Sequence, residues 1–99
     1  LELGGKSPNV IFADTDLESA VEWAMMGIFF NQGEVCCAGS RIIIEKSMKD
    51  AFVKRFAERA EKMTIGDPLK NPDMGPLVSN KHMEDVLAYI EAVRQRVQP

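Results

Sequence analysis

Two short apolar runs, separated by a longer stretch with helical periodicity, constrain the fold of this chain more than any other feature. Residues 10–13 follow Pro8, and their unbroken apolar character is typical of a buried strand. Residues 41–45 contain three consecutive isoleucines, which favour a strand buried on both faces. A strand, a helix and a second strand in this order predict two parallel strands joined by a helical crossover. We therefore expect an α/β fold with a parallel strand pair and packed helices.

The stretch between the two runs predicts a helix that is apolar on most sides. Thr15 and Glu18 match a capping box, in which each side chain bonds the backbone near the other, and predict the start of the helix. Residues 31–33 end it, and Gly33 suits a left-handed termination. One face carries Leu17, Ala20, Val21, Ala24, Met25, Ile28 and Phe29. The other face is also partly apolar through Trp23, Met26 and Phe30. We expect such a helix to need more burial than 99 residues supply.

Two more helices are predicted downstream. Ser47 is expected to cap the first of them, whose inward residues are Met48, Ala51, Phe52, Phe56, Ala60 and Met63. A turn-rich linker over residues 65–76 follows, with three prolines. Ser79 or Asn80 then caps the last helix. Its apolar stripe consists of Met83, Val86, Leu87, Ile90 and Val93.

Composition excludes several classes of function. The chain has 99 residues, a net charge of −3 and a pI of about 5.1, which argue for one domain and against a nucleic-acid partner. No apolar run is long enough for a membrane span, and no signal peptide opens the chain. The only cysteines, Cys36 and Cys37, are adjacent, so we expect free thiols, no structural zinc and a reducing, cytoplasmic location. Because the chain begins with Leu1 rather than Met, we expect it to be part of a longer protein.

A few residues are candidates for chemistry on their own. Cys36 lies in a loop after a buried helix, where a thiol serves either as a nucleophile or as a small buried apolar residue. Glu2 precedes two glycines, where a carboxylate can act as a general base on water or simply be exposed. His82 is the only histidine and could pair with Cys36 or lie at the surface. Residues 5–7, Gly-Lys-Ser, do not predict a phosphate loop, because a strand rather than a helix follows.

Two segments carry a resemblance to a known family. Residues 1–8, LELGGKSP, resemble the glutamate active-site motif of the aldehyde dehydrogenase superfamily. Residues 29–41, FFNQGEVCCAGSR, resemble its cysteine active-site motif, and Cys36 follows Glu2 by 34 positions. Residues 66–68 and 74–78 look like the continuation of the family, up to about Arg94. Glu34 departs from the family pattern, in which glutamine is common at this position.

The resemblance implies oxidation of a small-molecule aldehyde to a carboxylic acid with NAD or NADP as hydride acceptor. Cys36 would form a thiohemiacetal and then a thioester, and Glu2 would activate the water that hydrolyses it. The backbone N–H of Cys36 would help to hold the oxyanion. The resemblance further implies substrate-pocket positions at Phe30, Val35 and Cys37. Contacts to the cofactor are implied for Leu3, Gly4 and His82.

The resemblance also bears on the extent of the domain. We expect residues 1–99 to be a single partial domain from the N-terminal part of the catalytic domain, without the dinucleotide-binding domain, since no G-x-G-x-x-G pattern occurs. The isolated chain is therefore expected to be inactive, and the parent enzyme to be a homo-oligomer. Two alternatives stay open: an esterase activity of Cys36 with Glu2, and a non-catalytic α/β piece that self-associates through uncovered sheet edges and its apolar helix.

Overall fold

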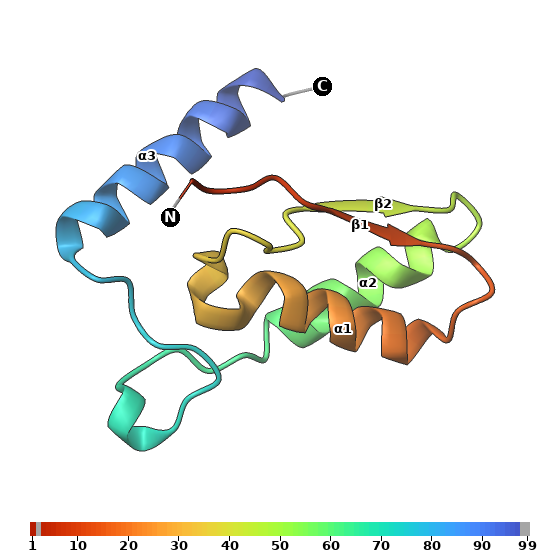
Figure 1. Ribbon diagram of the computed structural model, residues 1–99, viewed down its shortest axis with the longest axis horizontal. Coiled ribbons are helices and arrows are strands. Elements are labelled where there is room, and N and C mark those ends of the chain that lie inside the picture. Colours follow the sequence, from red (N-terminus) through yellow and green to blue (C-terminus); the bar gives the residue numbers. More distant parts are fainter. Residues whose placement is uncertain (2, 98–99) are drawn as a thin grey trace.

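The computed structural model describes residues 1 and 3–97, which form two strands, three α-helices and two short 3-10 helices. The order is β1 (Pro8–Ile11), α1 (Leu17–Phe29), η1 (Phe30–Gly33), β2 (Arg41–Ile44), α2 (Lys49–Ala60), η2 (Pro68–Lys70) and α3 (Asn80–Arg96). Figure 1 shows α1 and α2 beneath the strand pair and α3 extending away from it. Residues 5–7 lead directly into β1, as expected of a segment that is not a phosphate loop.

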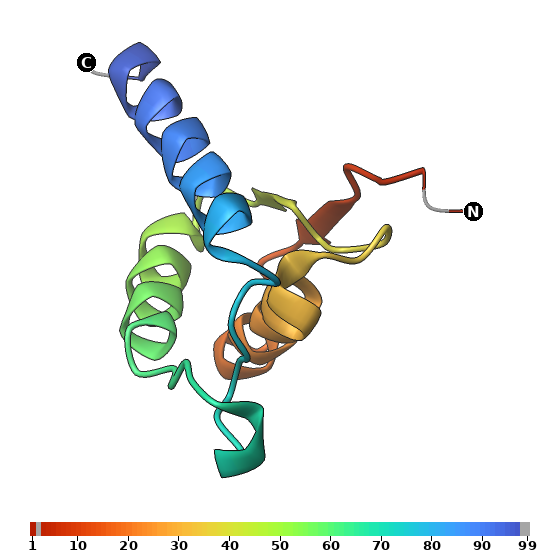
Figure 2. The ribbon, with the colours of Figure 1, turned by 90° about the vertical axis from the view of Figure 1, so that its left-hand side faces the viewer.

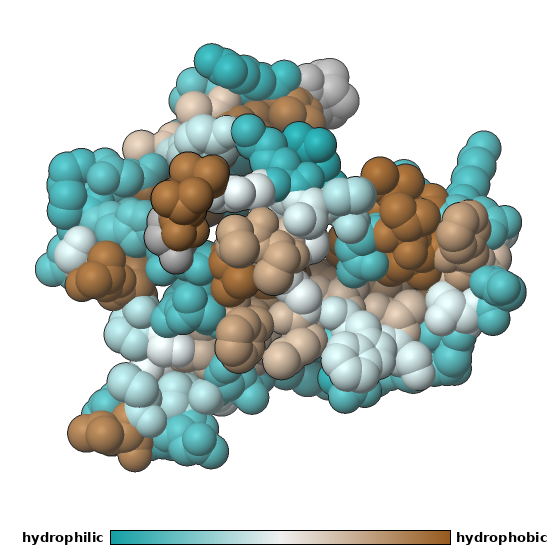
Figure 3. Space-filling model, in the orientation of Figure 1, coloured by the Kyte–Doolittle hydropathy of each residue, from teal (hydrophilic) through white to brown (hydrophobic). Residues whose placement is uncertain are grey.

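The two strands are parallel, which confirms the predicted α/β arrangement. Pro8 pairs with Arg41 and Ile11 with Ile44. Both helices that pack on the pair, α1 and α2, lie on the same side of it (Figure 2). The prediction that the second strand is buried on both faces is wrong: Ile43 is 54% exposed, because no helix among the residues that the structure describes covers the opposite face. On the face of the molecule seen in Figure 3, hydrophobic surface lies over the strands.

Helix α1 supplies most of the core, and the predicted apolar face is confirmed. Ala20, Val21 and Ala24 are buried against Ile11 of β1 and Phe52 of α2. The predicted cap at Thr15 is wrong. Asp16 is the N-cap residue, and its carboxylate accepts a hydrogen bond from the backbone N–H of Ser19 at 2.9 Å. That bond holds the pKa of Asp16 below its usual value, because it stabilises the charged form.

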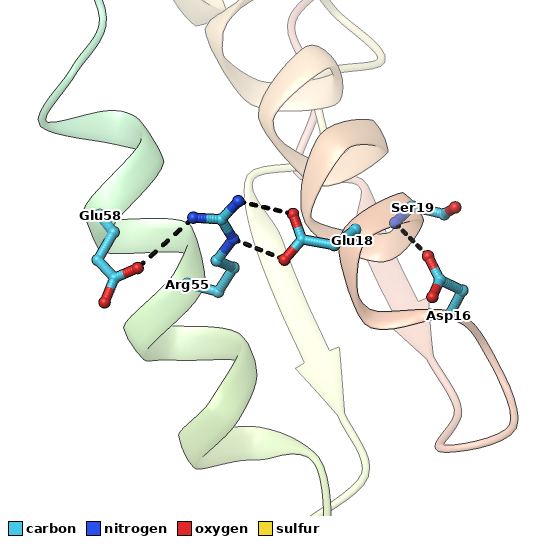
Figure 4. Close-up of polar contacts among 5 residues, drawn as sticks. All are labelled: Asp16, Glu18, Ser19, Arg55 and Glu58. Carbon is cyan, nitrogen blue, oxygen red and sulfur yellow. Dashed lines mark hydrogen bonds and ion pairs between the residues drawn. The ribbon is translucent and has the colours of Figure 1, made fainter.

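Glu18 does not reach back to the helix start but bridges α1 to α2. Its two carboxylate oxygens accept from Nε and Nη2 of Arg55, at 2.6 and 2.9 Å (Figure 4). This two-pronged contact with Arg55 lowers the pKa of Glu18 and raises that of Arg55. Arg55 also approaches Glu58 on its own helix, at 3.5 Å. The partner of Glu18 is thus 37 residues away, which local spacing does not predict.

Helix α2 begins without the predicted cap. Met48 rather than Ser47 is the N-cap residue, and no side chain bonds the first turn. Phe52 is buried, and its ring lies 5.7 Å from that of Phe56, centroid to centroid, which in turn lies 5.8 Å from the ring of Phe29. Ala51, predicted to face inward, is exposed. The contact between Phe29 and Phe56 therefore joins α2 to α1 in addition to the Glu18–Arg55 bridge.

The linker after α2 closes on itself before α3 begins. The carboxylate of Asp73 accepts from the backbone N–H and the hydroxyl of Thr64, at 2.8 and 2.7 Å, and these bonds lower the pKa of Asp73. Ser79 caps α3, as one of the two predicted alternatives, by accepting from the backbone N–H of His82. The predicted apolar stripe of α3 is exposed along its length. No helix among the described residues is long and apolar enough to cross a bilayer.

Candidate functional site

The segment that carries both cysteines begins at the end of helix α1, and its own end contacts the same helix again. The backbone N–H of Gly39 donates to the carbonyl oxygen of Gly27 in the last turns of that helix, at 3.0 Å. Ala38, just before it, is buried. Residues 30–39 therefore form an excursion whose two ends are held at one place, directly before β2.

The excursion opens with three consecutive left-handed residues. Asn31, Gln32 and Gly33 have φ values of 49°, 58° and 80°. Gly33 is required, because a Cβ there would lie 2.8 Å from the carbonyl oxygen of Ile28. For each of the other two, this conformation costs about 1–2 kcal/mol. Asn31 offsets part of that cost through bonds to Glu34: its carbonyl accepts from the backbone N–H at 2.9 Å, and its side-chain amide donates to the carbonyl at 3.2 Å.

Cys36 and Cys37 are the two central residues of a β-turn. The backbone N–H of Ala38 donates to the carbonyl oxygen of Val35 at 2.9 Å and closes the turn. Both thiols are free and both residues are exposed, so Cys36 is not the small buried residue that the sequence left open as an alternative. Val35 is half-buried beside them. The turn thus presents two adjacent thiols at the surface on a hydrogen-bonded backbone.

The amino-terminal segment passes directly against this turn. A Cβ added to Gly5 would lie 1.8 Å from the carbonyl oxygen of Cys36, so no side chain fits at that position. Gly4 beside it has a φ of 73° and open space where a Cβ would point. The parallel register explains the approach, because pairing of Pro8 with Arg41 makes the residues before each strand run alongside one another. Glu2 lies outside the described residues, but Leu3 and Gly4, its neighbours in the motif, lie within this arm.

His82 does not act as an unpaired surface residue. Its Nε2 lies 2.8 Å from a carboxylate oxygen of Glu34, two residues before Cys36. The side-chain amide of Gln32 donates to the carbonyl oxygen of Pro76 at 3.1 Å. The sequence motifs predict neither contact, because Glu34 and His82 are 48 residues apart and Gln32 and Pro76 are 44 residues apart.

Phe30 belongs to a groove to which the amino-terminal arm does not contribute a lining residue among those described. It lines an open groove between α1 and the linker, and it is 60% exposed. The other large apolar residues of that groove include Trp23 and Met26, which are 73% and 52% exposed. The expectation that this helix has more apolar surface than its neighbours cover is therefore confirmed.

Known proteins resemble the chain over nearly its whole length. A family model described as the aldehyde dehydrogenase family matches residues 1–98. A betaine aldehyde dehydrogenase of Cereibacter sphaeroides is 52% identical over 96 residues, which are 95% of this chain and 20% of that protein. An aldehyde dehydrogenase of Davidiella tassiana is 48% identical over 93% of this chain and 19% of its own length. The chain thus spans about one fifth of the length of the relatives it matches.

Solved structures agree with the sequence relatives. The betaine aldehyde dehydrogenase of Staphylococcus aureus, solved in complex with NAD+, superimposes with a TM-score of 0.89 at 40% identity over 98% of this chain and 19% of that one. An NAD-dependent aldehyde dehydrogenase of Sinorhizobium meliloti gives 0.90 at 36% identity over 98% and 20%. With the family pattern spanning residues 1–98 and the same fold in these enzymes, the chain belongs to the aldehyde dehydrogenase family.

Proposed function

We propose that this protein oxidises a small-molecule aldehyde to the carboxylic acid with NAD as the hydride acceptor, and that Cys36 is the nucleophile. The observation that carries the proposal is the approach of Gly5 to the carbonyl of Cys36. This contact supports a common site for the two motifs, because Gly5 of the first lies against Cys36 of the second although Glu2 and Cys36 are 34 positions apart in the sequence. The relatives named as aldehyde dehydrogenases, and the complex of one of them with NAD+, support the same reaction.

The first step belongs to Cys36. Its thiolate attacks the aldehyde carbon, a sulfur–carbon bond forms, and the carbonyl electron pair moves onto oxygen. Among the described residues, the backbone N–H of Cys36 donates no hydrogen bond, which leaves it available to that oxyanion. Val35, Cys37 and Phe30 are proposed to contact the aldehyde, the first two from the same turn and the third from the groove beside it.

When bound, NAD would supply the acceptor for the hydride that the substrate carbon loses, and Cys36 would then hold the substrate as a thioester. Leu3 and Gly4, the residues proposed to contact it, are both exposed, and nothing lies within 4 Å of the position that a Cβ of Gly4 would take, so their backbone is accessible to a bound group. His82 is proposed to lie beside the same group, with its Nε2 held by Glu34.

Glu2 is proposed as the general base of the second step. It removes a proton from water, the water oxygen attacks the thioester carbon, and the sulfur of Cys36 leaves. This division explains the need for two motifs: one side chain forms the covalent bond, and the other releases the product.

The test is to trap the intermediate. In the intact enzyme, incubated with aldehyde and NAD, Glu2→Gln is expected to accumulate an acyl group on Cys36, measured by mass spectrometry of the peptide. Added to Glu2→Gln, Cys36→Ala should abolish both the adduct and NADH formation. Cys37→Ala in the same background removes only a proposed contact to the aldehyde, so the adduct on Cys36 and NADH should still form. An acyl group on Cys37, or full turnover by Cys36→Ala, would contradict the proposal.

The 99 residues alone are proposed to lack dehydrogenase activity, because they contain no pyrophosphate-binding fingerprint. NADH production by this chain above that of its Cys36→Ala variant would refute this.

A second candidate function is non-catalytic self-association, favoured by the exposure of Trp23, Met26 and Phe30 on one helix and the turn after it. Light scattering tests it: a mass that rises with concentration, and falls in Met26→Lys, is expected. A monomer at every concentration would exclude it.

A further inference from the structure

The segment directly before the cysteine turn is fastened at two points to a part of the chain that follows much later. The Gln32 amide donates to the carbonyl oxygen of Pro76, and the Glu34 carboxylate meets Nε2 of His82. Residues 32–34 are thus held against residues 76–82, and the turn with Cys36 begins at the next position. The two contacts are independent, since one engages the linker and the other engages α3.

The first contact accounts for the backbone of Gln32. A non-glycine residue stays in the left-handed region only where its surroundings hold it there. Gln32 has a φ of 58°, and its side-chain amide is the group that reaches Pro76. The Gly75 backbone is also close, since a Cβ there would lie 3.2 Å from the Gln32 amide nitrogen. The linker therefore holds the strained residue from outside the excursion.

The second contact joins two backbones that are already fixed. The N–H and carbonyl of Glu34 are both bonded to Asn31. The N–H of His82 donates to the Ser79 hydroxyl at the start of α3, at 3.1 Å. Their side chains are 46% and 39% exposed, so water competes with the pair and its effect is local. The pair links the first turn of α3 to the residue just before the cysteine turn.

We propose that Gln32, Glu34 and His82 are positioning residues for Cys36, and that residues 76–82 act through them as the outer support of the nucleophile turn. The inference rests on the proposed function only in naming Cys36 as the nucleophile. In this arrangement the turn is held on one side by Gly5 and on the other by the start of α3. His82 acts on the thiol through Glu34 and does not touch it.

A double-mutant cycle on the intact protein tests the proposal. The rate of Cys36 alkylation by iodoacetamide is measured by peptide mass spectrometry, which separates it from Cys37. Glu34→Ala and His82→Ala are each expected to change the Cys36 rate in the same direction, by at least about threefold, as for residues in direct contact. The double variant should change it no further. Glu34→Gln, which keeps an oxygen acceptor, should restore a rate near that of the wild type.

Lys81→Ala is the matched control, because Lys81 is the neighbour of His82 but pairs with Asp85 inside α3. It should leave the Cys36 rate unchanged. Additive effects of the two alanine variants, or wild-type rates in both, would overturn the positioning role while leaving the nucleophile assignment intact. If wild-type Cys36 does not react, the proposed nucleophile fails. Amide hydrogen exchange of residues 34–39 then decides the support: both alanine variants should lose protection, and unchanged protection would overturn it.

Discussion

Gly5 is the residue through which the amino-terminal arm reaches Cys36. Any side chain there meets the Cys36 carbonyl, and the obstacle is backbone, which cannot rotate away as a flexible side chain does. Proximity of the two motifs therefore depends on a missing methyl group as much as on the residues that carry the chemistry.

Gly5→Ala is expected to lower the free energy of unfolding by about 1–3 kcal/mol, because the arm or the turn must shift. The measurement is chemical denaturation. Gly27→Ala, the matched control in helix α1, meets nothing within 4 Å and should raise stability by up to about 1 kcal/mol. Equal stability of wild type and Gly5→Ala would show that the close approach is absent in solution.

At the scale of elements, helix α1 shows what the sequence can and cannot predict: its apolar face can be predicted, but its N-cap residue cannot. Periodicity is sufficient for the apolar face of α1, because burial follows from spacing alone. It does not choose between Thr15 and Asp16, since both are capping residues with an acceptable partner three positions later. A capping box at Thr15 would need the carboxylate of Glu18, which instead accepts hydrogen bonds from Arg55 on α2. In the same way, the contacts of Gln32 and His82 join segments whose relative position only the folded chain defines.

The N-cap assignment gives a direct comparison of neighbouring residues. Asp16→Ala should destabilise the fold by about 1 kcal/mol, because the N–H of Ser19 loses its acceptor. Thr15→Ala should change stability by less than about 0.5 kcal/mol. Thermal unfolding followed by circular dichroism measures both. A larger loss in Thr15→Ala than in Asp16→Ala would restore the cap that the sequence pattern predicts.

The bridge between α1 and α2 predicts a dependence on pH. Arg55 holds the pKa of Glu18 below its usual value of about 4.5. The contribution of the bridge to stability is therefore fully present above that value and is lost as the pH falls through the lower, folded-state pKa. The difference in melting temperature between wild type and Glu18→Gln should be largest near pH 6 and shrink below about pH 4.5.

Removal of Arg55 provides the control for this bridge. In an Arg55→Met background, Glu18→Gln should change the melting temperature little at any pH, because the partner that lowers the pKa is gone. A difference of the same size at pH 3 and pH 6 in the wild-type background would mean that the ion pair does not stabilise the folded state.

At the scale of the whole molecule, the described residues form a small core on one side of the β1–β2 pair. The β-α-β order was sufficient to predict parallel strands, because such connections have few alternatives. The burial of both faces of β2 was not confirmed, because it needs a layer that the described residues do not supply. The two motifs predict which residues form the candidate site. They do not predict the contacts of residues 32–34 with residues 76–82, because no local pattern marks a contact such as that between Gln32 and Pro76.

The position of the core is tested by two neighbouring residues of α2. Phe52→Ala should lower the free energy of unfolding by about 3–5 kcal/mol, since Phe52 is 2% exposed and packs against α1. Val53→Ala, at 54% exposure, should change it by less than about 1 kcal/mol. Urea denaturation measures both variants. Similar losses in the two would mean that α2 presents a different face to the core.

The pairing of Pro8 with Arg41 also limits where the length of this chain can vary. Residues 5–7 and residues 38–40 are the two segments directly before this pair. The length of each segment sets the distance between its motif and the paired strands. Deletion of one residue from either segment would shift one motif relative to the other by about 3.3 Å, the rise of one extended residue. An insertion in residues 12–16, at the opposite end of the strands, would not change the length of either segment. Insertions and deletions among related chains should therefore collect in that turn and be absent from the two arms.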